Sequence, residues 1–134
     1  MALLGFTVFK EKILDGSKRQ TIRKLRKSPI KIGEELHLYW KLRTRACEKL
    51  IDATCSETFF ITPIVTRDTD GSLLMGSMHK HMEPDRLDDE ILRGDDLLDL
   101  ARRDGFTSFM DMIELLERMH GRLDGNKIFQ VIRW

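Results

Sequence analysis

The chain has 134 residues, of which 41% are hydrophobic and 34% are charged, and its formal net charge is +1. This length and composition predict a single globular domain over residues 1–134 and exclude a disordered or fibrous chain. No apolar run in the sequence approaches the roughly 20 residues that a membrane-spanning helix requires, so we expect no membrane partner.

The N-terminal half contains short segments with alternating strand and helix patterns. Gly16 predicts a left-handed cap after a short helix, and Pro29 predicts the end of a basic loop. The clearest pattern is a strict alternation of apolar and polar residues, which leaves Tyr39 on the polar face of a strand. In chain order, the predicted elements are a strand, a short helix, a turn with a strand, a basic loop and a strand, over residues 6–8, 9–14, 18–23, 24–29 and 35–42.

The C-terminal half begins with β-forming residues. Residues 50–65 predict one bent strand or two strands, and residues 66–83 predict a functional loop or lid because their periodicity is weak. A helix is predicted over 84–103, interrupted near Gly94, with Leu87 and Ile91 on one apolar stripe. A second helix begins at Ser108 and ends at Gly121, and residues 127–134 form a final strand. The core positions of the second helix are predicted to be Phe109, Met112, Ile113, Leu116 and Met119.

One short segment combines three groups that favour a ligand site. Gly16 allows a sharp turn, and the side chains of a strand alternate between its two faces. Thr21 and Arg23 therefore share one face while Ile22 points into the core, and Lys18 leans over the same face from the turn. An ammonium, a hydroxyl and a guanidinium together suit an anion, the edge of a nucleobase or a polarised carbonyl. A solvated turn that leads into an edge strand produces the same spacing.

The same segment carries a resemblance to a known family. The pattern Ile13-Leu14-x-Gly16-x-Lys18-x-x-Thr21-Ile22-Arg23, followed by Lys31-Ile32-Gly33-Glu34, resembles an ASCH domain over roughly the first third of the chain. ASCH domains are similar to PUA domains, which are small β-barrels that bind RNA. The resemblance implies an α+β fold with a PUA-like barrel of about five to six strands and flanking helices. It also implies that the chain binds RNA or a nucleotide.

Some members of that superfamily are hydrolases. One branch resembles an amidohydrolase that removes the acetyl group of acetylated cytidine, and the resemblance implies catalytic roles for Lys18 and Thr21. Asp104 falls where that branch has a glutamate, and its side chain is one methylene shorter. A lysine activates a threonine only if its pKa is lowered, which Arg19 and Arg23 would favour and Asp104 would oppose. Another branch resembles a ribonuclease, which no motif in this chain selects.

Positive charge is concentrated near this segment. Residues 10–49 contain thirteen Lys and Arg but five Asp and Glu, whereas acidic residues predominate in the remainder. A basic end can steer a polyanion to itself, and two oppositely charged faces of one domain give the same asymmetry. The residues that we predict to bind a ligand are Arg19, Arg23, Lys24, Arg26, Lys27 and Tyr39.

These patterns leave three hypotheses for the function. The first is a module that binds RNA or a nucleotide, the second is a small hydrolase that uses Lys18 and Thr21, and the third is a protein-interaction domain. We expect no metal or cofactor, because the chain has no Gly-rich phosphate loop and no clear ligand set. The spacing of Cys47 and Cys55 matches neither a zinc site nor a disulfide framework, so we expect reduced thiols and a cytoplasmic location.

Overall fold

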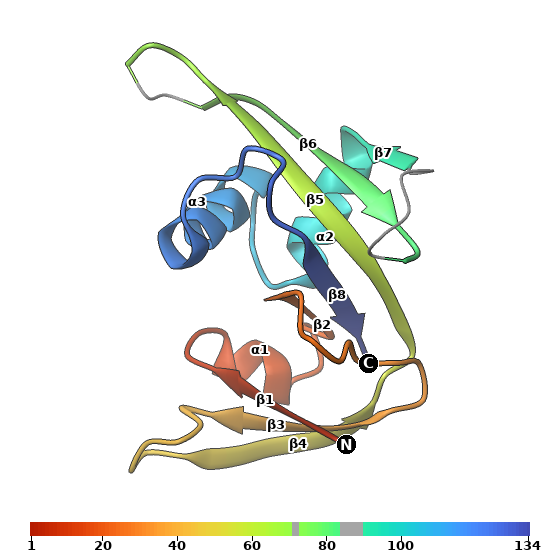
Figure 1. Cartoon of the computed structure of the whole chain (residues 1–134). Coiled ribbons are helices and arrows are strands. Elements are labelled where there is room, and N and C mark those ends of the chain that lie inside the picture. The colour runs from red at the N-terminus through yellow and green to blue at the C-terminus, as the bar shows by residue number, and fades with distance from the viewer. Residues whose placement is uncertain (71–72, 84–89) are drawn as a thin grey trace.

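The computed structural model describes residues 1–70, 73–83 and 90–134, and within these ranges the chain forms two sheets and three helices (Figure 1). The strands and helices in chain order are β1 (Ala2–Phe6), α1 (Lys10–Leu14), β2 (Gln20–Lys24), β3 (Glu35–Trp40), β4 (Glu48–Thr54), β5 (Glu57–Arg67), β6 (Leu73–His81), β7 (Glu90–Leu92), α2 (Asp95–Arg103), α3 (Phe109–His120) and β8 (Phe129–Arg133). The fold is therefore α+β, as the sequence predicts.

The two sheets have different topologies. The smaller sheet has the order β1-β3-β4, with β1 parallel and β4 antiparallel to β3. The larger sheet has the order β2-β8-β5-β6-β7 and is antiparallel throughout. Figure 1 shows the smaller sheet below the larger one, with β4 leading into β5. The described strands thus form two open sheets with no closed barrel, and the PUA-like barrel stays a prediction.

Most of the predicted elements are present. The first strand begins at Ala2, earlier than expected, and the region between 50 and 65 forms two strands rather than one. Pairing of β5 with β8 ends at Ile61, whereas its pairing with β6 continues through Pro63 to Arg67. The hydroxyl of Ser108 accepts a hydrogen bond from the Asp111 N–H, so this residue is the N-cap of α3.

Three predictions differ from the structure. The predicted lid is in its described part a hairpin, because residues 73–81 form β6 and pair with β5; cross-strand pairing orders a segment whose local pattern is weak. The predicted helix over 84–103 begins only at Asp95, since Ile91 lies in β7, and residues 84–89 with Leu87 lie outside the described residues. Met119 is 63% exposed and is not a core residue.

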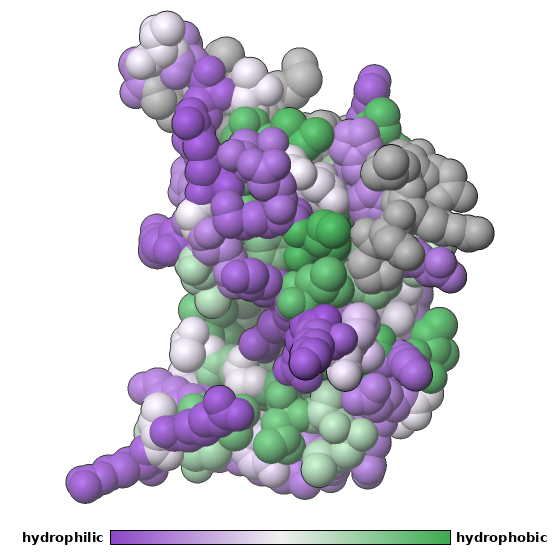
Figure 2. Space-filling view, in the orientation of Figure 1, coloured by the Kyte–Doolittle hydropathy of each residue, from purple (hydrophilic) through white to green (hydrophobic). Residues whose placement is uncertain are grey.

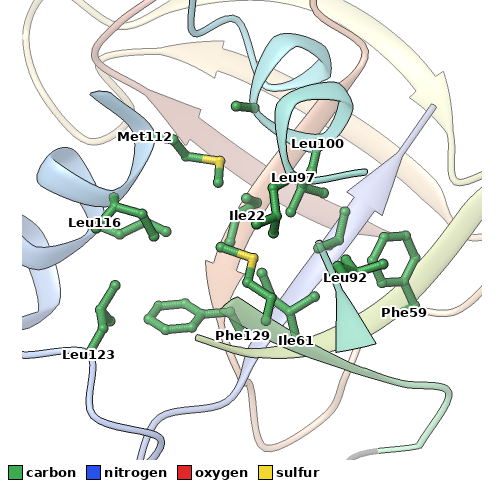
Figure 3. Close-up of a cluster of buried hydrophobic side chains, with 14 residues drawn as sticks. Ile22, Phe59, Ile61, Leu92, Leu97, Leu100, Met112, Leu116, Leu123 and Phe129 are labelled. Atoms are coloured by element: carbon green, nitrogen blue, oxygen red, sulfur yellow. The ribbon is translucent and has the colours of Figure 1, made fainter. Parts of the chain in front are cut away.

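Strand β8 connects two hydrophobic cores. Phe129 and Val131 belong to a cluster between the larger sheet and helices α2 and α3, whereas Ile132 and Trp134 belong to a cluster against the smaller sheet. Figure 3 shows Ile22 of β2 between the side chains of α2 and α3 in the first cluster. Because β2 contributes to this core, its register is fixed, and so are the positions of its polar side chains.

The surface is mixed. Figure 2 shows hydrophilic side chains over most of one face, with smaller hydrophobic areas near its centre. None of the helices in the described ranges is long and apolar enough to cross a membrane.

The first core predicts the effect of one truncation. Phe129 is fully buried, and its ring lies 5.1 Å from that of His120, so Phe129→Ala should lower the free energy of unfolding by about 3–5 kcal/mol. Ile32 is 65% exposed, and Ile32→Ala should change it by no more than about 0.5 kcal/mol. Urea denaturation of the two variants tests this assignment of the core, which equal effects would contradict.

Candidate functional site

The candidate site lies where the two sheets meet. Strands β1 and β2 are edge strands of different sheets, and side chains of one reach the backbone of the other. Arg23 Nη2 donates to the Gly5 carbonyl at 2.5 Å, and Arg26 Nη2 donates to the Leu3 carbonyl at 3.4 Å. We call this line of contacts, between Leu3 and Gly5 on one side and Arg23 and Arg26 on the other, the seam.

A cavity of about 320 Å³ opens at the seam. Its apolar wall is formed by β1, the turn before α1 and helix α3, and includes Phe6, Val8, Phe9, Phe106, Met112, Leu115, Leu116 and Met119. Its polar wall contains most of the residues that the sequence analysis selected, and includes Lys18, Thr21, Arg23, Lys24, Arg26, Asp104 and His120. The structure therefore brings Lys18, Thr21 and Asp104 to one cavity, although Asp104 is far from the other two in sequence.

Strand β2 positions Thr21 and Arg23 as the alternation predicts. Arg23 Nε donates to Thr21 Oγ1 at 3.0 Å, while Ile22 points to the opposite face and into the first core (Figure 3). The guanidinium of Arg23 also lies over the ring of Phe6, 4.7 Å from its centroid. Thr21 is 4% exposed, and the structure thus holds both side chains in one geometry.

Lys18 contacts the C-terminal end of α2. Its Nζ donates to the backbone oxygen of Asp104 and lies 3.3 Å from Asp104 Oδ2, and both residues are buried. Lys12 Nζ donates to the Gly105 carbonyl at 2.5 Å, and Gln20 Nε2 donates to the Leu100 carbonyl at 3.0 Å. The Leu100 carbonyl lies in the last turn of α2 and also accepts from the Asp104 N–H, whereas the carbonyls of Asp104 and Gly105 follow the last helical residue, so these side chains bind the C-terminal end of α2. Lys18 consequently has a structural role that is independent of any ligand.

Burial changes the acidity of this pair in opposite directions. It lowers the pKa of Lys18; the carboxylate of Asp104 opposes that shift, and Arg23 and Lys12 add to it. Burial likewise raises the pKa of Asp104, against the effects of Lys18 and Gln20. Both directions reduce the cost of moving a proton between the two groups. The opposing effects of Asp104 and Arg23 on Lys18 agree with the sequence-based expectation, but Lys12 takes the place of Arg19.

Sequence reasoning missed two residues that shape the site. Gln20 is fully buried; its Nε2 lies 3.3 Å from Asp104 Oδ1, and its Oε1 accepts from Arg133 Nε at 2.9 Å. Phe9 has a positive φ of 64°, and its ring packs edge-on against Phe106 at 5.0 Å. The Gly that follows Asp104 was the available signal for that packing, because a Cβ there would lie 3.1 Å from the Phe9 ring.

Three predicted ligand-binding residues lie away from the cavity. Arg19 is exposed and lines a separate surface pocket with Arg103 and Arg133. Lys27 is exposed in the loop after β2, and Tyr39 is half-buried on β3 in the smaller sheet. Of the residues predicted to bind a ligand, Arg23, Lys24 and Arg26 line the cavity.

Metal ligands and cysteines do not add to the site. Among the residues that the structure describes, no group of three or more His, Cys, Asp or Glu side chains is placed to hold a metal ion. His81 bonds through Nε2 to Thr62 Oγ1 at 2.9 Å. Cys47 is exposed and Cys55 is buried, and both are free thiols.

Comparison of the chain with protein-family models, curated proteins and solved structures gave no match. The resemblance to ASCH domains accordingly stays a prediction that rests on the motif around Lys18, Thr21 and Arg23.

The pair of Lys18 and Asp104 predicts a non-additive effect on stability. Lys18→Met leaves the buried Asp104 carboxyl without its cationic partner and should lower the free energy of unfolding by about 3–5 kcal/mol. Asp104→Asn in the same chain removes the stranded acid, so the double variant should be more stable than Lys18→Met alone. Urea denaturation of the two single variants and the double variant measures the coupling, and additive effects would show that the two side chains do not interact.

Proposed function

We propose that the cavity binds the base of a nucleoside, either free or within RNA. The observation that carries this proposal is a cavity with aromatic walls and hydrogen-bond donors at one end. Its volume of about 320 Å³ is at the lower end of the roughly 300–1,000 Å³ typical of ligand pockets, which suits a ligand of this size. Proteins that recognise unpaired bases commonly stack them on aromatic rings and bond to their polar edges.

The polar end of the cavity suits the acceptor atoms of a base. Thr21 Oγ1 accepts from Arg23 Nε, which leaves the hydroxyl proton of Thr21 for a further acceptor. Arg23 uses Nε and Nη2 in its contacts with Thr21 and Gly5, and Nη1 remains as a donor. Carbonyl oxygens and ring nitrogens on the edge of a base accept such bonds.

The apolar wall supplies surface for the flat faces of a base. Phe9 and Phe106 meet edge-to-face, and Phe6 lies beneath the guanidinium of Arg23. A base that stacks on an aromatic ring gains about 1–3 kcal/mol, whichever base it is. This wall therefore contributes affinity, whereas Thr21 and Arg23 contribute selectivity.

The proposal predicts which side chains affect binding of cytidine. Phe106→Ala should weaken binding by about 5- to 150-fold, the equivalent of one stacking contact. Thr21→Val keeps the side-chain shape but removes the hydroxyl and should weaken binding by about 2- to 12-fold. Isothermal titration with cytidine and with a short single-stranded RNA measures both effects.

Met110 is a matched control for these variants. It lies on α3 like the cavity-lining residues, but it is 48% exposed and is not part of the cavity. Met110→Ala should bind cytidine as the wild type does, and thermal midpoints confirm that all variants are folded. Wild-type protein that binds neither probe, or variants with unchanged affinity, would refute the proposal.

A second candidate function is an amidohydrolase that acts on acetylated cytidine. The observation that favours it is the buried Lys18, with a lowered pKa, in the same cavity as Thr21. Neutral Lys18 would take the hydroxyl proton of Thr21 as Oγ1 attacks the acetyl carbon, and would return that proton to the departing amine. Water would then hydrolyse the acetyl ester on Thr21 to acetate. Since both contacts of Lys18 Nζ given above go to Asp104, this candidate requires a rearrangement and ranks second.

Turnover separates the two candidates. A hydrolase should release acetate from acetylated cytidine, and Thr21→Val should abolish the release. Adding Lys18→Met to Thr21→Val should cost little more, because residues that act as a unit are not additive. Acetate release is followed by the accompanying proton release or by chromatography. A protein that binds cytidine but releases no acetate is a binding module only.

A further inference from the structure

The seam concentrates positive charge, and the hydrogen bonds of its two arginines go to neutral oxygens rather than to carboxylates. Some cations elsewhere on the surface are paired with carboxylates at 2.6–3.0 Å, as in the pairs Lys10–Glu48, Arg103–Asp99 and Arg133–Glu57. At the seam, the hydrogen bonds of Arg23 and Arg26 described above go to neutral oxygens of Thr21, Gly5 and Leu3. Among the described residues that line the cavity, Asp104 is the one carboxylate, and it is paired with Lys18.

The two seam arginines are spaced for a single anion. Leu3 and Gly5 are two residues apart on β1, so their carbonyls point to the same edge and lie roughly 7 Å apart. The guanidinium groups that donate to these carbonyls are held at a similar separation. Burial lowers the pKa of Arg23 to about 10, the Asp104 carboxylate opposes that shift, and Arg26 adds to it, so the two arginine charges act on each other. A phosphate between two guanidinium groups forms short charge-assisted bonds, of about 2.7–2.9 Å, to both.

The free edge of β2 adds a backbone donor next to Arg23. The Leu25 N–H donates to the Ile128 carbonyl, and the Trp134 N–H donates to the Arg19 carbonyl. Odd-numbered residues of this strand therefore turn their backbone toward β8, and even-numbered residues turn theirs away from it. The backbone N–H of Lys24 consequently points away from β8, at the free edge of β2 and next to Arg23 in the strand. Backbone N–H groups near arginines commonly contact phosphate oxygens.

We infer that the seam is a phosphate site and that the ligand of the cavity is a nucleotide: the base enters the cavity, and one phosphate lies between Arg23 and Arg26. The binding of the base in the cavity rests on the proposed function, whereas the phosphate site at the seam does not. Arg23 is fixed by its bonds to Thr21 and Gly5 and forms the inner side of the site. Arg26 is exposed, and its bond to Leu3 is long at 3.4 Å, so it is the side chain that turns onto the phosphate.

The test compares ligands that differ only in the phosphate. Isothermal titration of the wild type with cytidine, cytidine 5′-monophosphate and cytidine 3′-monophosphate at constant ionic strength should show at least one nucleotide bound about 10-fold or more tighter than cytidine. In Arg26→Gln, the affinity for that nucleotide should be close to the affinity for cytidine, so that their ratio is close to one. Arg45→Gln is the matched control, because Arg45 is an exposed arginine in the turn after β3 and should leave the ratio unchanged.

A second variant addresses the inner arginine. Arg23→Lys keeps the charge but loses the fork that bonds Thr21 and Gly5, so it should lower the nucleotide-to-cytidine ratio while the protein remains folded. Equal affinity of the wild type for cytidine and both nucleotides would overturn the inference, as would a ratio that Arg26→Gln leaves intact. Titration with inorganic phosphate shows whether the site takes a free phosphate or a nucleotide. If inorganic phosphate binds in an Arg26-dependent manner, and cytidine and both nucleotides bind no more tightly than inorganic phosphate does, the nucleotide assignment and the proposed function are both wrong. If cytidine binds but phosphate adds nothing, only the seam inference is wrong.

Discussion

The capping of α2 by side chains from α1 and β2 is the interaction on which the candidate site depends. The C-terminal end of a helix carries partial negative charge and unpaired carbonyls, and lysine is a natural partner for both. Lys18 and Lys12 donate to the carbonyls of Asp104 and Gly105 directly after the helix, and Gln20 donates to the Leu100 carbonyl in its last turn. This contact joins the N-terminal third of the chain to residues 100–105, which are distant in sequence. It thereby places Phe106, and α3 after it, as a wall of the cavity opposite β2.

The two cationic side chains of the cavity, Lys18 and Arg23, differ in their partners. Lys18 is buried but has a carboxylate beside it, so its charge is compensated within the protein. Arg23 is half-buried and donates hydrogen bonds to a hydroxyl and a carbonyl, and the Asp104 carboxylate acts on its charge without a direct contact. Desolvation of a cation is costly, and an anionic ligand in direct contact with Arg23 would reduce that cost. The direct ion pair of Lys18 therefore favours a structural role for Lys18, and the hydrogen bonds of Arg23 to neutral oxygens favour a role for Arg23 in binding a ligand.

The sequence predicted those parts of the site that depend on local geometry. Alternation along a strand placed Thr21 with Arg23 and sent Ile22 to the core, and the distance of 3.0 Å between the first two confirms their shared face. The capping box likewise located the start of α3 at Ser108. The seam was not predictable in this way, because it depends on how two sheets approach each other. No local pattern indicates that Arg23 will reach Gly5, or that β6 will pair with β5.

The position of Asp104 in the cavity was predicted only from the resemblance to ASCH domains. The helix pattern around Asp104 predicted no more than the end of a helix. The structure gives a physical reason for its position, since a residue at the C-cap of α2 faces the donors of α1 and β2. Gln20 had no such signal: a glutamine in a strand looks the same in sequence whether it is exposed or, as here, fully buried between Asp104 and Arg133.

The backbone at Phe9 supports a functional origin for the cavity. A left-handed conformation is unfavourable for a bulky residue by about 1–2 kcal/mol, and glycine would adopt it without that cost. Phe9 occupies the position nevertheless, and its ring packs on Phe106 above a glycine that leaves room for it. The packing of the Phe9 ring thus compensates for backbone strain that a glycine at this position would not have. Strained residues cluster at ligand sites because they hold side chains in one orientation, and here the strained residue forms the aromatic wall of the cavity next to Lys18.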